Sequence, residues 1–178
     1  MTSQSSPLGT LREGLPEPAR DLKVNLQTVL QESTLTTDQR YGVAVACALA
    51  ARSPRLGQAM LDEARLHVQP PVVDDARAAA ALMAMNNVYY RFKHMVGKDE
   101  YQPLPARLRM TRIARPATSK ADFELMCLAV SAIGGCERCI QAHEKTVREA
   151  GLTAEQVNDA IRIAAVVMGA AVGLELGV

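Results

Sequence analysis

The stretch Ile133-Gly-Gly-Cys-Glu-Arg-Cys-Ile-Gln-Ala-His143 decides how the C-terminal half of this chain folds. An apolar, helix-forming run precedes the two glycines, and an amphipathic run follows them as far as Gly151. Glycine ends helices and permits tight turns because it lacks a Cβ. The pattern therefore predicts a helical hairpin: one helix from Ser119 or Asp122 to Ile133, a tip at Gly134-Gly135, and a second helix over 136–150.

The rest of the chain repeats this helical character. Aromatic residues make up only 3% of the sequence, and alanine and valine dominate its apolar positions. No segment alternates apolar and polar residues for long enough to indicate a strand. We therefore predict an all-α fold. Its first helices are expected to begin near residue 16 or 17, at 36, at 54, and at 74 or 75, the last of them interrupted at Asn86-Asn87. A short helix is expected to end near 115, and the last helix to begin at 153.

The length of 178 residues suits a single domain. Residues 1–10 are rich in Ser, Thr, Gln, Pro and Gly and are expected to form a flexible tail, leaving residues 11–178 as one helical domain. An internal echo is also visible. Asp74 and Asp122 each precede a long apolar helix that reaches a doublet, Asn86-Asn87 or Gly134-Gly135. This predicts a duplicated unit at about 74–97 and 122–150.

Composition argues against several classes of partner. The formal net charge of +1 gives no electrostatic reason to bind nucleic acid or an anionic membrane. Residues 1–10 lack the apolar core of a secretory signal. The most apolar run, 163–174, is shorter than the roughly 20 residues that cross a bilayer. We therefore expect a cytoplasmic protein that binds neither membrane nor nucleic acid.

The four cysteines fall into two groups. Cys47 and Cys127 stand singly in apolar helical patterns and are expected to be small buried hydrophobes. Cys136 and Cys139 are separated by two residues, which in a reducing compartment indicates redox or metal chemistry. The start of a helix lowers the pKa of a thiol, and Arg138 would add positive charge there as a stabiliser of the thiolate.

His143 and Glu124 complete the candidate site. His143 lies one helical turn after Cys139 on the same face and is a candidate general base for that thiol. Glu124 precedes the predicted tip by about as many residues as His143 follows it, so the two would be level across the hairpin. A carboxylate in an otherwise apolar helix needs a partner. These residues predict a relay from Glu124 through His143 to Cys139.

Zinc binding is the alternative for these residues. Cys136, Cys139, His143 and Glu124 could together supply four zinc ligands in a non-enzymatic, metal-stabilised module. Structural zinc sites usually draw their ligands from two separate segments, whereas three of these four would share one helix. We therefore favour redox chemistry over zinc.

The sequence resembles the alkylhydroperoxidase D family of the carboxymuconolactone-decarboxylase-like superfamily. The residues that carry the resemblance are 123–125 and 131–144, together with 15–26, 85–91 and 108–110. It therefore extends over nearly all of the chain after residue 10. One departure is Arg138, because the family often has a histidine there and a guanidinium does not release its proton near neutral pH.

The resemblance implies an internally repeated helical fold, a homotrimer and a role in peroxide defence. Protein-bound dihydrolipoamide on a lipoyl-bearing acyltransferase would reduce the cysteine pair, which passes electrons to a peroxiredoxin and reduces alkyl hydroperoxides weakly. No tightly bound cofactor is implied. Cys139 would be the peroxide-reactive thiol and Cys136 the resolving thiol, with His143 and Glu124 as the relay. Cys136, nearer the tip, is expected to meet the dithiol.

A second enzymatic alternative comes from the same superfamily. A decarboxylase or lactone-processing enzyme would fit the fold, but its chemistry does not need two neighbouring thiols. The residue pattern therefore favours a thiol-dependent oxidoreductase.

Overall fold

Two apolar helices, α3 (Thr37–Ala50) and α7 (Lys120–Gly134), pack against each other at the centre of the molecule. Every residue from 41 to 48 and from 123 to 131 is buried. Small side chains let the two backbones approach closely, since a Cβ added at Gly42 would overlap the side chain of Met126. The alanine-rich composition is thus used for close helix packing.

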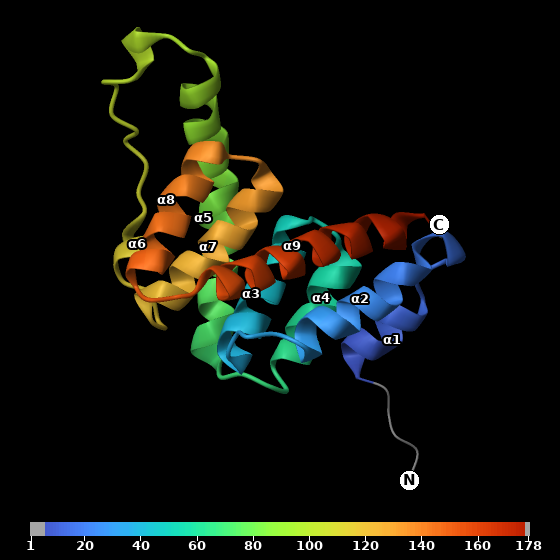
Figure 1. Cartoon of the computed structure of the whole chain (residues 1–178). Coiled ribbons are helices and arrows are strands. Elements are labelled where there is room, and N and C mark those ends of the chain that lie inside the picture. Colours follow the sequence, from blue (N-terminus) through green and yellow to red (C-terminus); the bar gives the residue numbers. More distant parts are fainter. Residues whose placement is uncertain (1–5, 177–178) are drawn as a thin grey trace.

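The computed structural model describes residues 6–176, and within them all regular structure is helical (Figure 1). Helices α5 and α9 flank the central pair, α2 packs along α9, and α1 packs on α4. The all-α prediction is confirmed. The other elements are α1 (Pro7–Glu13), η1 (Glu17–Ala19), α2 (Arg20–Gln31), α4 (Pro54–Ala64), α5 (Pro70–Met95), η2 (Asp99–Tyr101), α6 (Thr111–Ala114), α8 (Glu137–Glu149) and α9 (Ala154–Glu175).

The N-terminal segment differs from the prediction. Residues 7–10, expected to be part of a flexible tail, form the first half of α1, and residues 1–5 lie outside the described part of the chain. Ser6 caps α1 by accepting a hydrogen bond from the N–H of Gly9 at 3.1 Å. The N–H of Leu8 donates to Oε2 of Glu63 at 3.1 Å, and this bond attaches α1 to α4. Capping and a tertiary bond thus order a segment whose composition suggests a loop.

Helix α5 passes unbroken through Asn86-Asn87, so the predicted interruption was wrong. It also begins at Pro70, with two prolines in its first turn, and not at Asp74 or Asp75. Asparagine disfavours helices because its side chain competes for backbone hydrogen bonds. Here the Asn87 amide is engaged elsewhere: it accepts from Oγ of Ser131 at 3.1 Å and donates to the Val130 carbonyl at 3.5 Å.

The internal repeat lies elsewhere than predicted. Because α5 has no break, residues 74–97 do not form a helix–break–helix unit matching 122–150. The helix order that does recur is α3–α4–α5, followed by α7–α8–α9. In both copies an apolar helix begins at a hydroxyl N-cap, Thr36 or Ser119, a short connection leads to an amphipathic helix, and a long helix follows. Gln39 and Asp122, each the third residue of its helix, meet at 2.8 Å between Nε2 and Oδ1.

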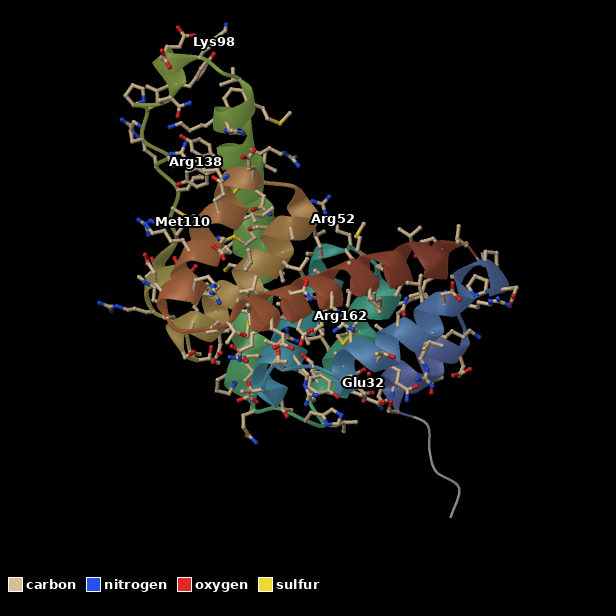
Figure 2. All side chains as sticks on the ribbon, viewed as in Figure 1. Glu32, Arg52, Lys98, Met110, Arg138 and Arg162 are labelled. Atoms are coloured by element: carbon tan, nitrogen blue, oxygen red, sulfur yellow. A yellow bond between two sulfur atoms is a disulfide. The ribbon has the colours of Figure 1, made fainter. Side chains whose placement is uncertain are left out.

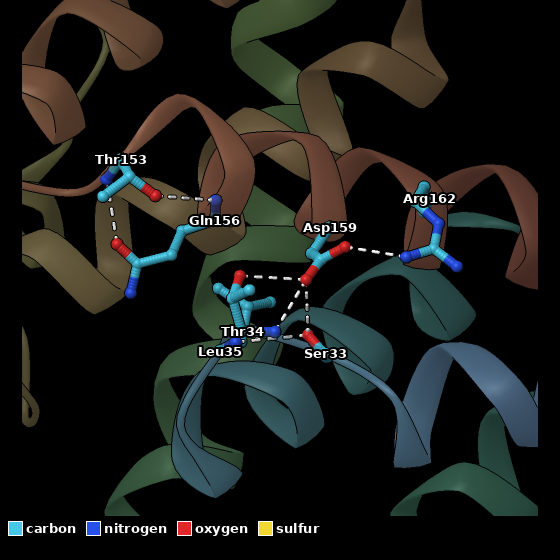
Figure 3. Close-up of polar contacts among 7 residues, drawn as sticks. All are labelled: Ser33, Thr34, Leu35, Thr153, Gln156, Asp159 and Arg162. Carbon is cyan, nitrogen blue, oxygen red and sulfur yellow. Dashed lines mark hydrogen bonds and ion pairs between the residues drawn. The ribbon is translucent and has the colours of Figure 1, made fainter.

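Equivalent aspartates tie the two copies together. Asp159, the sixth residue of α9, accepts from the N–H and Oγ1 of Thr34 at 2.7 and 2.9 Å and from Oγ of Ser33 at 3.1 Å (Figure 3). Asp75, the sixth residue of α5, accepts from the N–H and Oγ1 of Thr118, both at 2.7 Å. Each aspartate therefore anchors the segment that leads into the first helix of the opposite copy.

The C-terminal half of α5 extends beyond the body of the molecule and carries a long excursion, with Lys98 near its outer end (Figure 2). Nζ of Lys93 donates to the carbonyls of Gln102 and Leu104 at 2.9 and 3.0 Å, which holds the returning chain against α5. This returning segment leads to Met110 and α6, beside α8 (Figure 1). It supplies part of the wall of the site described below.

Helix α9 is long and apolar enough to cross a membrane by length and composition. Half of its most apolar window is buried inside the protein, however, against α2, α3 and α7. Burial in the bundle therefore accounts for the apolar residues on the inner face of α9.

Candidate active site

Helices α7 and α8 meet at the glycine tip that the sequence predicts. Gly135 adopts a left-handed φ of 61°, and its N–H donates to the Ala132 carbonyl at 3.2 Å. The N–H of Cys136 donates to the Ser131 carbonyl at 3.2 Å. These two bonds satisfy carbonyls at the end of α7 and place Cys136 as the N-cap of α8. The predicted helical hairpin is confirmed.

Cys136 and Cys139 form a disulfide across the first turn of α8, with Cα atoms 5.3 Å apart. Cys136 is fully buried, whereas 6% of Cys139 is exposed. Cys139 also lines the cavity described below, which makes it the more accessible of the two cysteines in the disulfide form. The expectation that Cys136 meets the dithiol stays a prediction.

Glu124 and His143 are in direct contact across the hairpin. Nδ1 of His143 lies 2.5 Å from Oε2 of Glu124, and their side chains are 13% and 6% exposed. The partner makes the buried carboxylate tolerable in the apolar α7. A carboxylate on Nδ1 also fixes the ring and leaves Nε2 for proton transfer.

A cavity of about 220 Å³ lies beside the disulfide and His143. Cys139 and His143 both line it, so a bound molecule would meet both residues together. Figure 2 shows Arg138 near the start of α8 and Met110 on the segment that returns beside it. The complete lining is Asn86, Tyr90, Met110, Ile113, Arg138, Cys139, Ala142 and His143.

Comparison with known proteins identifies the family. Residues 99–174 match the Carboxymuconolactone decarboxylase family. A relative from Anaeromyxobacter sp. (strain K), named alkyl hydroperoxide reductase AhpD, is 63% identical over 169 residues, which cover 95% of this chain and 91% of the relative. The chain belongs to the AhpD family. AhpD proteins from Azorhizobium caulinodans and Methylobacterium sp. (strain 4-46) are each 49% identical, over 93% and 94% of this chain and 91% and 96% of their own lengths.

The AhpD family likeness includes both copies of the repeat. The Carboxymuconolactone decarboxylase match begins at residue 99 and contains the second copy with its disulfide hairpin. The AhpD relatives match more than nine-tenths of the chain, so their likeness extends through α3, α4 and α5 as well.

The Arg138 guanidinium lines the cavity but also reaches away from the disulfide, with Nη1 3.5 Å from Oε1 of Gln102. Its positive charge therefore lies at the rim of the cavity, exposed to solvent. The role of Arg138 as a thiolate stabiliser stays a prediction. Its position explains how this AhpD family member accommodates a charged residue beside the cysteine pair.

Sequence reasoning missed the far wall of the cavity. Asn86 and Tyr90 come from α5, one helical turn apart, and Met110 and Ile113 come from the segment around α6. The spacing of Asn86 and Tyr90 indicates a shared helical face. Nothing in the sequence places that face against α8, which depends on tertiary packing.

The two other histidines, His67 and His94, lie outside the cavity and also have carboxylate contacts. Nε2 of His94 lies 3.1 Å from Oε2 of Glu137, at the first residue of α8. His67 stacks on Tyr41 with ring centroids 4.5 Å apart, and its Nε2 lies 3.2 Å from Oε1 of Glu63. The first pair links α5 to α8 and the second joins α4 to the residues that follow it, so neither histidine is isolated.

The zinc alternative gains no geometric support. Within residues 6–176, no group of three or more His, Cys, Asp or Glu side chains is arranged to hold a metal ion. Both site thiols are also joined to each other. Cys47 and Cys127 are buried, and burial raises the pKa of both thiols, as expected for cysteines that serve as packing residues.

Proposed function

We propose that this protein is a thiol-dependent alkyl hydroperoxide reductase that also delivers electrons to a peroxiredoxin. The observation that carries the proposal is the juxtaposition of the Cys136–Cys139 disulfide with the buried Glu124–His143 pair at one cavity. The disulfide accepts two electrons and two protons to become a dithiol, which can pass them on, and the imidazole beside it can move the protons. The name of the AhpD relatives supports a peroxide as acceptor.

In the oxidative half of the cycle, His143 accepts the proton of the Cys139 thiol. The thiolate attacks the terminal oxygen of the hydroperoxide, forming an S–O bond as the O–O bond breaks. The alkoxide leaves as the alcohol after taking a proton from the His143 imidazolium. Cys136 then attacks the Cys139 sulfenic acid, releasing water and restoring the disulfide. Glu124 stabilises the imidazolium through the contact at Nδ1.

In the reductive half, a dihydrolipoamide thiolate attacks Cys139, the more accessible of the two cysteines. This step releases the Cys136 thiol and forms a mixed disulfide. The second lipoyl thiol then attacks the lipoyl sulfur of the mixed disulfide and releases Cys139 as a thiol. The products are lipoamide and the reduced cysteine pair. Dihydrolipoamide on a lipoyl-bearing acyltransferase is the proposed donor. The reduced pair can equally pass its two electrons to the disulfide of a peroxiredoxin.

Assembly and location belong to the same proposal. We place the protein in the cytoplasm, where a dithiol donor keeps the pair cycling, and propose a homotrimer. Exposed apolar side chains at Val24, Val88 and Val172 give material for subunit contacts. Sedimentation analysis would distinguish a trimer from other closed assemblies.

The test is hydroperoxide-dependent oxidation of dihydrolipoamide by the purified protein, with and without a peroxiredoxin. We expect turnover that rises when the peroxiredoxin is present and that is abolished in Cys139→Ser. Cys127→Ser is the matched control, because Cys127 is buried away from the cavity and should retain full activity. A well-folded protein without lipoamide oxidation would refute the proposal and direct attention to the decarboxylase alternative.

A further inference from the structure

One residue that lines the cavity beside Cys139 has a buried polar atom without a partner. Asn86 is 4% exposed, and its Nδ2 donates to Sδ of Met110 at 3.1 Å. Its Oδ1 has no hydrogen bond from any residue between 6 and 176. A thioether sulfur can only accept, which assigns the amide nitrogen to the Met110 side and the oxygen to the other. Asn86 thus lines the cavity and carries a buried acceptor that no described residue uses.

An unsatisfied buried acceptor is unusual in folded proteins, and at a ligand site it indicates a donor that the ligand brings. No lysine lines this cavity, and of the described residues only Arg138 brings a charge from the exposed rim. An occupant that carries its own N–H or O–H group would satisfy this acceptor, and it would lie close to Cys139 and His143, which share the cavity with Asn86.

The remaining walls describe the rest of the occupant. Tyr90, Met110, Ile113 and Ala142 give mostly apolar surface. The volume of about 220 Å³ is below the roughly 300–1,000 Å³ of pockets for drug-sized ligands. The cavity thus fits a small organic molecule with an apolar body and one hydrogen-bond donor near its reactive end.

We propose that Asn86 is a substrate-binding residue whose Oδ1 accepts the O–H of an organic hydroperoxide, with the organic group against Tyr90, Met110 and Ile113. This inference rests on the proposed function and names how its substrate is held. The bond fixes the terminal oxygen, which is the atom that the Cys139 thiolate attacks. Hydrogen peroxide offers the same O–H but no apolar body, so the cavity favours organic hydroperoxides.

The same bond can persist through the reaction. As the Cys139 sulfur donates two electrons, the S–O bond forms and the O–O bond breaks, and the alkoxide takes a proton from the His143 imidazolium. The hydroxyl held by Asn86 is transferred intact to sulfur. In the sulfenic acid it remains a donor to Oδ1 until Cys136 displaces it as water. Asn86 therefore positions the group before and after transfer.

The first experiment compares wild type with Asn86→Leu, which keeps the size of the side chain and removes the acceptor. Protein reduced with dithiothreitol and desalted is reacted in single turnover with cumene hydroperoxide. We expect a rate about five- to tenfold lower, the effect of losing one hydrogen bond. The rate with methyl methanethiosulfonate, which has no donor group, should stay unchanged, as should reduction of the disulfide by dihydrolipoamide.

Two further variants separate binding from folding. Ala84→Ser changes an exposed residue of the same helix outside the cavity and should match wild type in all three rates. Ala142→Phe adds bulk at an exposed position of the lining and should slow cumene hydroperoxide more than hydrogen peroxide. This selectivity tests the apolar part of the site even if Asn86→Leu does not fold.

Other results would overturn the inference. Equal slowing with all reagents would give Asn86 a structural role, and an unchanged hydroperoxide rate would remove it from the site. Slowing of dihydrolipoamide alone would assign the acceptor to the lipoyl amide. A wild-type protein that does not react with hydroperoxide would refute the proposed function itself. Because wild type is measured first, this failure is distinguished from a failure of the inference about Asn86.

Discussion

His143 shows how a single contact can set the chemistry of a residue. Its Nδ1 is held 2.5 Å from Glu124, and the ring borders the cavity with Cys139. Neither His67 nor His94 has this combination: each pairs with a glutamate, but neither lines the cavity. Proximity to a thiol, and not the histidine alone, makes His143 the candidate base.

We expect His143→Gln to lower the single-turnover rate with cumene hydroperoxide by about 100-fold, the lower end of general acid–base contributions. Glutamine can still contact Glu124, but it cannot accept and return a proton. Stopped-flow detection of disulfide formation would measure the rate. His67→Gln is the control, because it removes a histidine that also pairs with a glutamate but lies outside the cavity. Equal rates for wild type and His143→Gln would refute the relay.

Residues near each other in sequence were the ones that sequence reasoning could place. Cys136, Cys139, His143 and Glu124 belong to one hairpin, so helical geometry alone brings them together. Asn86 and Met110 come from distant segments, and their approach depends on how α5 and the returning excursion pack on α8. Periodicity gives the face of a helix but not the neighbour of that face.

The helix boundaries also divide into those that local sequence predicts and those that depend on tertiary contacts. Thr36 and Thr153 both form the capping boxes that their spacing predicts, with Gln39 and Gln156 as the returning partners. Helix α5 was misread at Asn86-Asn87, because long-range bonds to Ser131 and Val130 offset a local preference. That error also moved the predicted repeat to the wrong helices.

The packing of α5 on α7 depends on Gly134. A Cβ there would overlap the Asn87 amide nitrogen and lie 3.2 Å from Cβ of Asn87. We expect Gly134→Ala to lower the free energy of unfolding by about 1–3 kcal/mol, because the two helices must separate. Urea denaturation would measure it.

Gly57→Ala provides the contrast for that measurement. At Gly57, inside α4, an added Cβ meets its nearest atom, Cδ2 of Leu49, at an ordinary 3.4 Å. Alanine is favoured over glycine within a helix, so this variant should be neutral or more stable by about 0.5–1 kcal/mol. If both variants lost the same stability, helix propensity or the unfolded state would explain the effect in place of the α5–α7 contact.

The helix order α3–α4–α5 recurs as α7–α8–α9, and only the second set carries the cysteine pair. In the first copy Ser53, the N-cap of α4, occupies the position of Cys136, and Leu56 occupies that of Cys139. Helix α1 packs on α4 in this copy, whereas the cavity borders α8 in the other. Asp75 and Asp159 join the copies, so the scaffold of the site depends on both.

Asp75 should make the stability of the whole fold sensitive to acid. Burial alone would raise the pKa of this carboxyl, but hydrogen bonds from Ala117, Thr118 and Arg112 outweigh it and lower the pKa. Because the pKa is lowered in the folded state, the carboxylate contributes its full share to the free energy of unfolding above its ordinary pKa of about 3.9. The contribution is lost as pH falls through the folded value.

We therefore expect Asp75→Asn to lower the free energy of unfolding at pH 7 by about 3 kcal/mol. Arg112 would lose its carboxylate partner, and the segment at Thr118 would lose the charged acceptor that anchors it. The deficit should shrink below pH 4, where the wild type loses the same contribution. Thermal or urea unfolding at pH 7 and pH 3 would measure both. Asp74→Asn is the matched control, since Asp74 is the exposed neighbour of the fully buried Asp75. If the two variants behaved alike, the acid sensitivity would come from negative charge on α5 in general. The bonds from Asp75 to the segment before α7 would then not be its cause.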